Sequence, residues 1–391
     1  MSDPVSQRLR RFASSPGARE AAAAFLVARL LGSLAAAIAL AGIPSFPMAP
    51  ALDYLPQARG PLYNMTIGLW ERWDALWILR AAEQGWSAGN QGAAVFPLYP
   101  LAIRALHRAG IPWLVGALSI SNVCFLVGLY LVYRLAEIDH GAETARRAVW
   151  LQALYPGSLF FLAPYSEALF LALSAGALYA ARRRRWWLAG LLGGAASATR
   201  VVGVLVVGAL AVEFWQQRRE PNRVRLRSAL SLLLSPLGLL AFILFWRLQS
   251  GNPFEFLVQS RLWGRSLMAP WNTLYLGLLQ AGQSIDRYPR GVYLLEAGGA
   301  VALLAVAIGG LRVLRPSYSA LLWLGILPLV VNPVPVRLFC SLLRYAAVLF
   351  PASIALAAMV RRPTLNEALR LLLAGLFALC TALFITSHWL F

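Results

Sequence analysis

Apolar runs of about twenty residues recur along the whole 391-residue chain, and short clusters of arginine separate them. A run of this length is what a helix needs to cross a lipid bilayer. Only 13% of the residues are charged and 59% are hydrophobic, whereas a soluble domain of ordinary composition carries about 25% charged residues. The chain is therefore predicted to be an all-α polytopic membrane protein.

The arginine clusters orient the predicted spans. The chain contains no lysine, and its formal net charge is +19. Such a charge also suggests nucleic-acid binding, but arginines that alternate with apolar runs are typical of the cytoplasmic loops of membrane proteins. Nucleic acid is therefore excluded, and membrane lipids with anionic headgroups are expected contacts. The clusters are Arg8/Arg10/Arg11/Arg19, Arg146/Arg147, Arg182–Arg185, Arg218–Arg227, Arg312/Arg315 and Arg361/Arg362.

Threading the apolar runs between these clusters predicts one membrane domain, 1–391, with about eleven spans. They are 21–43, 113–135, 148–163, 165–181, 188–199, 201–215, 229–248, 292–314, 317–331, 344–360 and 368–387. Residues 1–20 then form a cytoplasmic tail, and the C-terminus lies outside. Two long extracytoplasmic loops, 44–112 and 249–291, are expected to fold back onto the membrane surface as interfacial helices, because both are rich in aromatic residues, proline and arginine.

Several of the predicted spans are too short to cross about 30 Å of hydrocarbon as straight helices. Two pairs of short runs turn at polar knots, "APYSE" (Ala163–Glu167) and "SATR" (Ser197–Arg200). Broken spans are tolerated where the irregular backbone is buried in protein or lines a wet cavity. Both knots are therefore predicted to face a cavity rather than lipid.

One stretch of the first loop, "LWERWDALWILRAAEQGW" (Leu69–Trp86), reads as a helix with a carboxylate on its apolar face. At about 100° per residue, Asp74 falls at the edge of the face that carries Trp70, Trp73 and Trp77. An interfacial helix explains the tryptophans but not Asp74, because a carboxylate is costly in hydrocarbon. Either Asp74 caps a helix or pairs with a nearby arginine, such as Arg72 or Arg80, or it faces a polar cavity or a substrate.

Five blocks resemble, in order, the PIG-V family of membrane mannosyltransferases, which has the GT-C fold. They are "RWDALWILRAAEQGW" with "FPLYPLAIR", "YPGSLFFLAPYSEALFLALS" (Tyr155–Ser174), "ASATRVVGVLV" (Ala196–Val206), "FLVQSRLWGRSLMAPW" (Phe256–Trp271) and "SLLRYAAVLFPASIALA" (Ser341–Ala357). The Trp-Asp loop and the Pro-Tyr-Ser-Glu knot are the most specific of these blocks. The resemblance implies transfer of a sugar from a polyprenyl-phosphate donor, on the side of the membrane away from the cytoplasm.

In this family resemblance, Asp74 matches the loop aspartate that acts as general base toward an acceptor hydroxyl. The phosphate of the donor needs cations, for which Arg200, Arg265 and Arg344 are the candidates. The chain has no Asp-x-Asp motif to hold a metal-bound nucleotide, so no cofactor is assigned. Metal dependence stays open, because Glu167 could approach Asp74 in space.

Glu167 is the second predicted catalytic carboxylate. The alternative is that Glu167, together with Ser166, only caps the N-terminus of the following helix. Trp73, Gln259, Trp263 and Trp271 are predicted to contact sugar rings, against the alternative of anchoring at the membrane interface. Arg29, inside the first span, requires a partner. The predicted substrate-binding set is completed by residues of the same blocks and of the C-terminus, namely Arg72, Tyr99, Tyr165, Tyr345 and His388.

The leading hypothesis is an inverting enzyme that moves mannose from polyprenyl-phosphate mannose to a lipid-linked or cell-envelope glycan. The all-arginine composition suggests a bacterial inner membrane, where the GPI acceptor is absent. A GT-C enzyme for another polyprenyl-phosphate sugar is the first alternative, since a few hydroxyl contacts decide sugar specificity. A non-enzymatic glycolipid transporter is the second, and it predicts an internal repeat and polar residues at the bilayer midplane. The sequence shows no convincing repeat.

Overall fold

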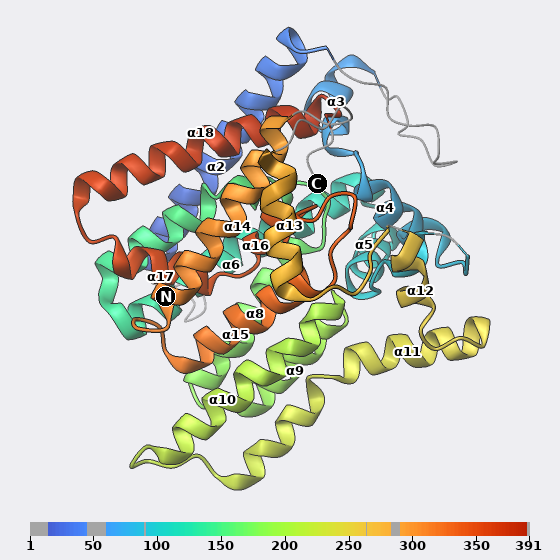
Figure 1. The fold of residues 1–391 in the computed structure, drawn as a ribbon. Coiled ribbons are helices and arrows are strands. Elements are labelled where there is room, and N and C mark those ends of the chain that lie inside the picture. Colours follow the sequence, from blue (N-terminus) through green and yellow to red (C-terminus); the bar gives the residue numbers. More distant parts are fainter. Residues whose placement is uncertain (1–14, 45–59, 90, 263, 283–289, 389–391) are drawn as a thin grey trace, which may run out of the picture.

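A computed structural model describes residues 15–44, 60–89, 91–262, 264–282 and 290–388. These residues form helices almost throughout, as Figure 1 shows. The prediction of an all-α polytopic membrane protein is confirmed. The first half of the chain contains α2 (Pro16–Gly42), α3 (Pro61–Thr66), α4 (Asp74–Gln84), α5 (Leu98–Arg108), α6 (Trp113–Ala153), α7 (Leu159–Leu162), α8 (Glu167–Arg182) and α9 (Trp186–Ser197).

The second half contains α10 (Val206–Arg219), α11 (Leu237–Ser250), α12 (Glu255–Leu262), α13 (Pro270–Gly282), α14 (Arg290–Gly310), α15 (Pro316–Val331), α16 (Leu342–Ala347), α17 (Pro351–Met359) and α18 (Pro363–Ile385). Five segments of the described residues are 3₁₀ helices: η1 (Gly68–Trp70), η2 (Gln91–Ala94), η3 (Pro156–Ser158), η4 (Val201–Leu205) and η5 (Leu226–Leu234). Both predicted outer loops therefore contain short helices, α3 to α5 in the first and α12 and α13 in the second.

Within the described ranges, six helices are long and apolar enough to cross a membrane, or seven if one bent pair counts as a span. The sequence predicts about eleven spans. The difference arises because several predicted spans are short or broken helices. The axis turns by 99° between Pro156–Leu162 and Glu167–Arg182, α6 is interrupted at Gly141, where φ is +79°, and 344–360 divides into α16 and α17.

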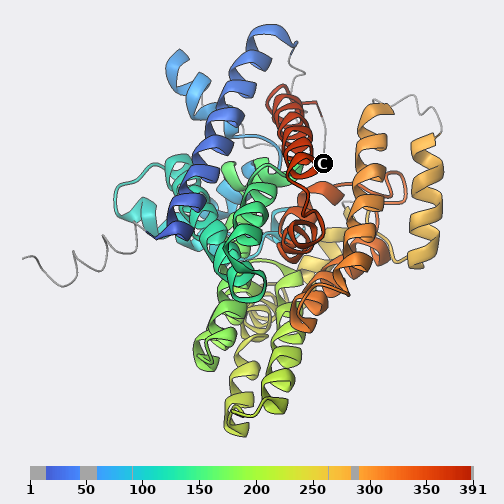
Figure 2. The same cartoon turned by 90° about the vertical axis from the view of Figure 1, so that its left-hand side faces the viewer.

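Helices distant in sequence pack side by side around α6 and α8. The helix α2 lies against α6 and α18, and α10 lies against α15 (Figure 1). Small residues allow these close approaches, since α2 buries Ala21, Ala24, Ala28 and Gly32 on one face, as membrane helix interfaces commonly do. After a 90° turn of the view, α13 and α14 stand at one side of the molecule, and α10 and η5 project at its lower end (Figure 2).

A buried ionic network joins four helices at one end of α8 and α15. Glu213 of α10 is completely buried, and it accepts hydrogen bonds from Arg315 at 2.8 and 3.0 Å and from Ser317 at 2.7 Å. Arg182, at the end of α8, lies 3.6 Å from Glu213 and binds Asp139 of α6 through two bonds of 2.6 and 2.8 Å. The helices α8 and α15 are thus fastened at the end opposite to Glu167 and Asn332.

Replacing the buried Glu213 by alanine leaves the partly buried Arg182 and Arg315 without this partner, so we expect the Glu213→Ala protein to lose about 3 kcal/mol of unfolding free energy. The measurement is denaturant or thermal unfolding of the purified protein in detergent. Glu367→Ala is the matched control, because the side chain of Glu367 is 56% exposed in its pair with Arg370, and an exposed pair contributes at most about 1 kcal/mol. Equal losses in both proteins would contradict this view of the network.

Candidate active site

Asp74 is the first residue of α4, and a strained turn places it there. Trp73 has φ +57° and ψ −127°, a conformation that a residue with a side chain adopts only where its surroundings impose it. Three hydrogen bonds hold the turn. The hydroxyl of Tyr165 donates to the carbonyl of Arg72 at 3.2 Å, the Arg72 guanidinium donates to Ser387 Oγ at 2.9 Å, and Trp73 Nε1 donates to the carbonyl of Phe384 at 3.4 Å.

The prediction of one helix through Leu69–Trp86 is therefore wrong at its beginning. The tertiary hydrogen bonds outweigh the local helical pattern, so that η1 ends at Trp70 and α4 starts only at Asp74. Trp70 consequently does not share a helical face with Asp74. The carboxylate instead lies in the first turn of α4, where the helix dipole favours a negative charge.

The two polar knots meet on the wall of one cavity, as the sequence predicts. Ser166 comes from the first knot, and Thr199 and Arg200 come from the second. Ser166 makes no side-chain capping bond to α8, but its hydroxyl accepts a bond of 3.4 Å from Arg200. The breaks in the helices thus deliver polar side chains to the cavity.

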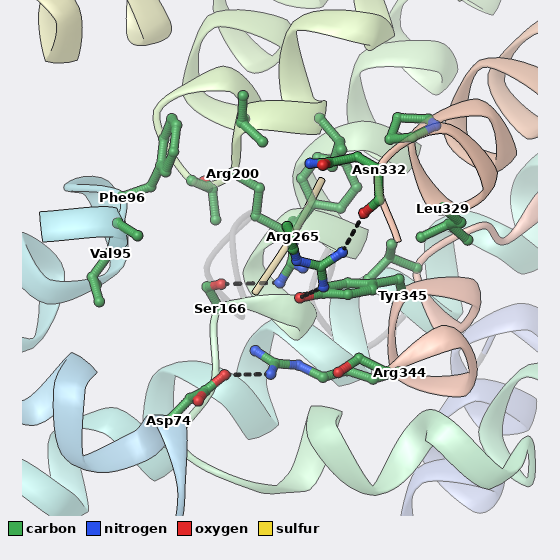
Figure 3. A pocket seen from close by; sticks show the side chains of 18 of the residues that line it. Asp74, Val95, Phe96, Ser166, Arg200, Arg265, Leu329, Asn332, Arg344 and Tyr345 are labelled. Carbon is green, nitrogen blue, oxygen red and sulfur yellow. Dashed lines mark hydrogen bonds and ion pairs between the residues drawn. The ribbon is translucent and has the colours of Figure 1, made fainter. Parts of the chain in front are cut away.

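Arg344 of α16 bridges the two predicted catalytic carboxylates. Its Nη1 lies 2.5 Å from Asp74 Oδ2, and its Nε lies 2.5 Å from Glu167 Oε1 (Figure 3 shows the first pair). Arg200 also binds Glu167 Oε1, at 2.6 Å. Glu167 has no exposed surface, whereas the side chain of Asp74 is 30% exposed. Among the residues described, Asp74 is the one carboxylate that lines the cavity, and Glu167 lies behind it.

Three arginines surround the ring of Tyr345. The guanidinium carbons of Arg200, Arg265 and Arg344 lie 5.1, 5.3 and 5.5 Å from the ring centre, which is within cation–π range. Arg265 donates to the Asn332 carbonyl at 3.0 Å and to the Tyr345 hydroxyl at 3.2 Å. In the described part of the chain Arg265 has no carboxylate partner. The three arginines therefore carry one positive charge more than the two carboxylates, Asp74 and Glu167, can neutralise.

The cavity has a volume of about 700 Å³ and combines this polar cluster with an apolar arm. Side chains of α8, η4 and α15 line the arm, namely Phe170, Val202, Leu205, Leu321 and Leu329. Leu321 and Asn332 are eleven residues apart on and beyond α15, which corresponds to about 16 Å along a helix axis. The cavity can therefore hold a charged headgroup at one end and a hydrocarbon chain along the arm.

The two long loops form another wall of the cavity. Val95 and Phe96 of the first loop and Phe256 of the second line it. Glu255 joins the loops, because it accepts hydrogen bonds from Gly89 N at 3.2 Å and from Gln259 Nε2 at 2.8 Å. These bonds hold the pKa of Glu255 below its usual value, with the bond from Gln259 as the largest cause.

Several predicted substrate-binding residues do not line the cavity. Gln259 supports the loop junction, and Trp271 is 71% exposed elsewhere. His388 contacts Thr386, and its Nδ1 lies 2.8 Å from that hydroxyl. Arg72 and Tyr165 support the Trp73 turn from behind. Trp263 lies outside the described residues.

Trp73 and Tyr99, by contrast, do line the cavity. Tyr99 is fully buried, and its hydroxyl is engaged by the Ala117 carbonyl at 2.8 Å and by Ser121 at 2.6 Å.

The segment between α15 and α16 is not among the predicted site residues. Asn332, Val334, Arg337 and Ser341 from this segment all line the cavity. The signal was present as "NPVPVR", a polar and proline-rich break after an apolar run. The sequence leaves open whether Asp74 and Glu167 together bind a metal ion. In the structure the Arg344 guanidinium lies between these two carboxylates. Nowhere in the described ranges do three metal-ligating side chains lie together.

Glu167 and Asp74 differ in burial and in the number of arginines that they bind, and this difference predicts an order of stability. Glu167→Gln removes the buried charge that Arg344 and the partly buried Arg200 share, so we expect a loss of about 3 kcal/mol or more. Asp74→Asn leaves Arg344 bound to Glu167, so its loss should be smaller. Thermal unfolding of both proteins in detergent measures the order, and a larger loss for Asp74→Asn would contradict the assigned burial.

The comparisons with known proteins agree with the motifs over part of the chain. The family model described as Mannosyltransferase (PIG-V) matches residues 61–250. GPI alpha-1,6-mannosyltransferase 2 is 33% identical over 162 residues in Rattus norvegicus and 32% identical over 157 residues in Homo sapiens, which are 38% and 37% of this chain. GPI mannosyltransferase 2 of Yarrowia lipolytica is 28% identical over 136 residues, or 34% of this chain.

The matched segments span 32%, 31% and 37% of the length of these three relatives. The blocks at Phe256–Trp271 and Ser341–Ala357 lie outside the range of the family model. Asp74, Glu167 and Arg200 lie inside it. Residues 61–250 therefore match the mannosyltransferase (PIG-V) family, which is the family that the motifs resemble.

Proposed function

We propose that the cavity is the active site of an inverting glycosyltransferase that moves mannose from polyprenyl-phosphate mannose to a lipid-linked or cell-envelope glycan. The observation that carries this proposal is the position of Asp74. It is the one carboxylate on the described cavity wall, and it faces a cluster of arginines with surplus positive charge. The family match and the names of the relatives support a sugar transfer with mannose.

The arginine cluster suits the phosphate of the donor. Arginine binds phosphate through two parallel hydrogen bonds, and Arg265 has its charge uncompensated by any described carboxylate. The apolar arm of the cavity suits the polyprenyl chain, because its lining of aliphatic and aromatic side chains offers no polar partner. The donor would then lie with its phosphate beside Tyr345 and its chain along α15.

Asp74 is suited to act as the general base in a single-displacement reaction at the anomeric carbon. The acceptor hydroxyl attacks the anomeric carbon and loses its proton to the Asp74 carboxylate, while the bond from that carbon to the phosphate oxygen breaks. The leaving phosphate keeps its negative charge beside the arginines, so it requires no general acid. Arg344 binds Asp74 in the structure, and a donor phosphate that engages Arg344 would release the carboxylate for catalysis.

We propose a positioning role for Glu167, the other predicted catalytic residue. It is completely buried, and its Oε1 is shared between Arg200 and Arg344. From this place it holds both guanidinium groups toward the cavity without contact with a substrate. We further propose that the site faces the extracytoplasmic side of a bacterial inner membrane, since the arginine clusters mark the other side.

Replacing Asp74 by asparagine should abolish transfer and leave donor binding intact. Loss of a general base lowers turnover about 10²–10⁴-fold, whereas Arg344 gains freedom to bind phosphate once its competing carboxylate is gone. The experiment combines a transfer assay, with polyprenyl-phosphate mannose and a lipid extract of the host, and an equilibrium binding assay with polyprenyl phosphate. We expect the Asp74→Asn protein to bind polyprenyl phosphate at least as tightly as the wild type.

The matched control is Glu83→Gln, the same kind of change at an exposed position of α4, which should keep wild-type transfer. If the Asp74→Asn protein transferred sugar at the wild-type rate, Asp74 would not be the general base. If the wild type binds polyprenyl phosphate but transfers no mannose, glucose or arabinose, the transporter alternative gains weight and a flipping assay decides.

Replacing Arg265 by glutamine should weaken binding of the donor more than it lowers the turnover rate. A charge-assisted hydrogen bond contributes about 1.5–3 kcal/mol, so we expect the donor KM to rise roughly 10- to 100-fold. Steady-state kinetics with varied donor measures this change. Arg261→Gln, at an exposed position of α12 outside the cavity lining, should behave as the wild type. An unchanged donor KM for Arg265→Gln would exclude Arg265 from the phosphate site.

A further inference from the structure

The first span carries an arginine that the proposed mechanism does not use. Arg29 lies in the middle of α2, among alanine, leucine and valine. An arginine inside an apolar span is costly unless it meets a partner within the protein. Among the described residues it has two partners from distant parts of the chain. Its Nη1 donates to the carbonyl of Leu162 at 3.2 Å, and its guanidinium lies 4.9 Å from the centre of the Trp70 ring.

The contact with Leu162 stabilises the sharpest bend of the fold. Leu162 is the last residue of α7, and the axis turns by 99° before α8 begins at Glu167. A helix that ends leaves carbonyl groups without an intrahelical partner, and within a membrane such groups must be satisfied inside the protein. Arg29 satisfies one of them. The four residues that follow include Tyr165 and Ser166, which support and line the site.

The contact with Trp70 supports the other segment that enters the site. Trp70 is 1% exposed and ends η1, directly before the strained turn at Trp73. A guanidinium over an indole ring is attracted to the ring most strongly where water is excluded. Arg29 therefore contacts the segments that lead into both carboxylates, four residues before Asp74 and five residues before Glu167. Arg344 joins the two carboxylates themselves.

We propose that Arg29 is a positioning residue of the active site, which fixes Asp74 relative to Glu167 and Arg344 by holding Trp70 and the Leu162 bend together. The proposal rests on the proposed function. Its contacts with Leu162 and Trp70 do not involve Arg200, Arg265 or Tyr345, the groups assigned to the donor phosphate. Loss of the Arg29 contacts should therefore misplace the base and leave the phosphate site unchanged.

The experiment compares the full-length Arg29→Met and Arg29→Lys proteins with the wild type. Misplacement of a reacting group by about 1 Å can cost up to 10²-fold in rate. We expect Arg29→Met to lower kcat at least about 10-fold, with the donor KM and the Kd for polyprenyl phosphate unchanged. Arg29→Lys, which can still donate to the Leu162 carbonyl but offers no planar group to Trp70, should have an intermediate kcat. The matched control is Leu30→Met at the neighbouring position, which is 68% exposed and should leave kcat unchanged.

Two results would overturn the proposal. One is a wild-type kcat in the Arg29→Met protein, and the other is a parallel loss of kcat and polyprenyl-phosphate binding, as a general loss of structure produces. If Arg29→Met protein does not fold, the Arg29→Lys protein decides in the same way. If the wild type itself neither transfers sugar nor binds polyprenyl phosphate, the proposed function fails instead, and the comparison of kcat does not arise.

Discussion

The bridge from Asp74 through Arg344 to Glu167 is the interaction on which the site depends. Its members come from the start of α4, the start of α8 and the short helix α16, which are far apart in the sequence. A buried ion pair repays its desolvation only if its geometry is good and its remaining hydrogen bonds are satisfied. The Trp73 turn, the bend before α8 and the break before α16 each set the position of one member, and errors in any of them would leave a buried charge unpaired.

The broken helices serve the same need to bring polar side chains from separate segments together at the site. Unbroken spans would place backbone and apolar side chains where the cavity now lies, whereas breaks at Leu162–Ser166 and Ser197–Arg200 turn polar groups inward. Each break frees backbone groups that lipid cannot satisfy, and side chains from other helices supply the partners. Arg29 does so for Leu162, and Arg265 does so for Asn332. Arginine serves both purposes in this chain, since its several donors can satisfy carbonyls, carboxylates and a bound anion.

Two polar clusters mark opposite ends of α8 and α15, and their charge balance differs. One network pairs three arginines with three carboxylates, namely Arg182, Arg184 and Arg315 with Asp139, Glu213 and Glu220. Around Tyr345 the arginines outnumber the carboxylates. The balanced network can serve stability alone, because every charge has a partner within the protein. The unbalanced one retains a site for an anion, and it opens into a cavity with an apolar arm.

The sequence alone determined the helical membrane class, the positions of the polar knots, and Asp74, Glu167, Arg200, Arg265 and Arg344 as the residues of interest. The membrane class, the knots and the unusual place of Asp74 among tryptophans follow from local composition and period, whereas Glu167 and the three arginines are implied by the resemblance to the PIG-V family. Only the tertiary structure decided that Glu167 is buried behind Asp74, that Gln259 joins two loops, that α4 begins at Asp74, and that Arg29 contacts Leu162 and Trp70. These features depend on contacts between segments tens to hundreds of residues apart, and no local pattern records which segments will meet.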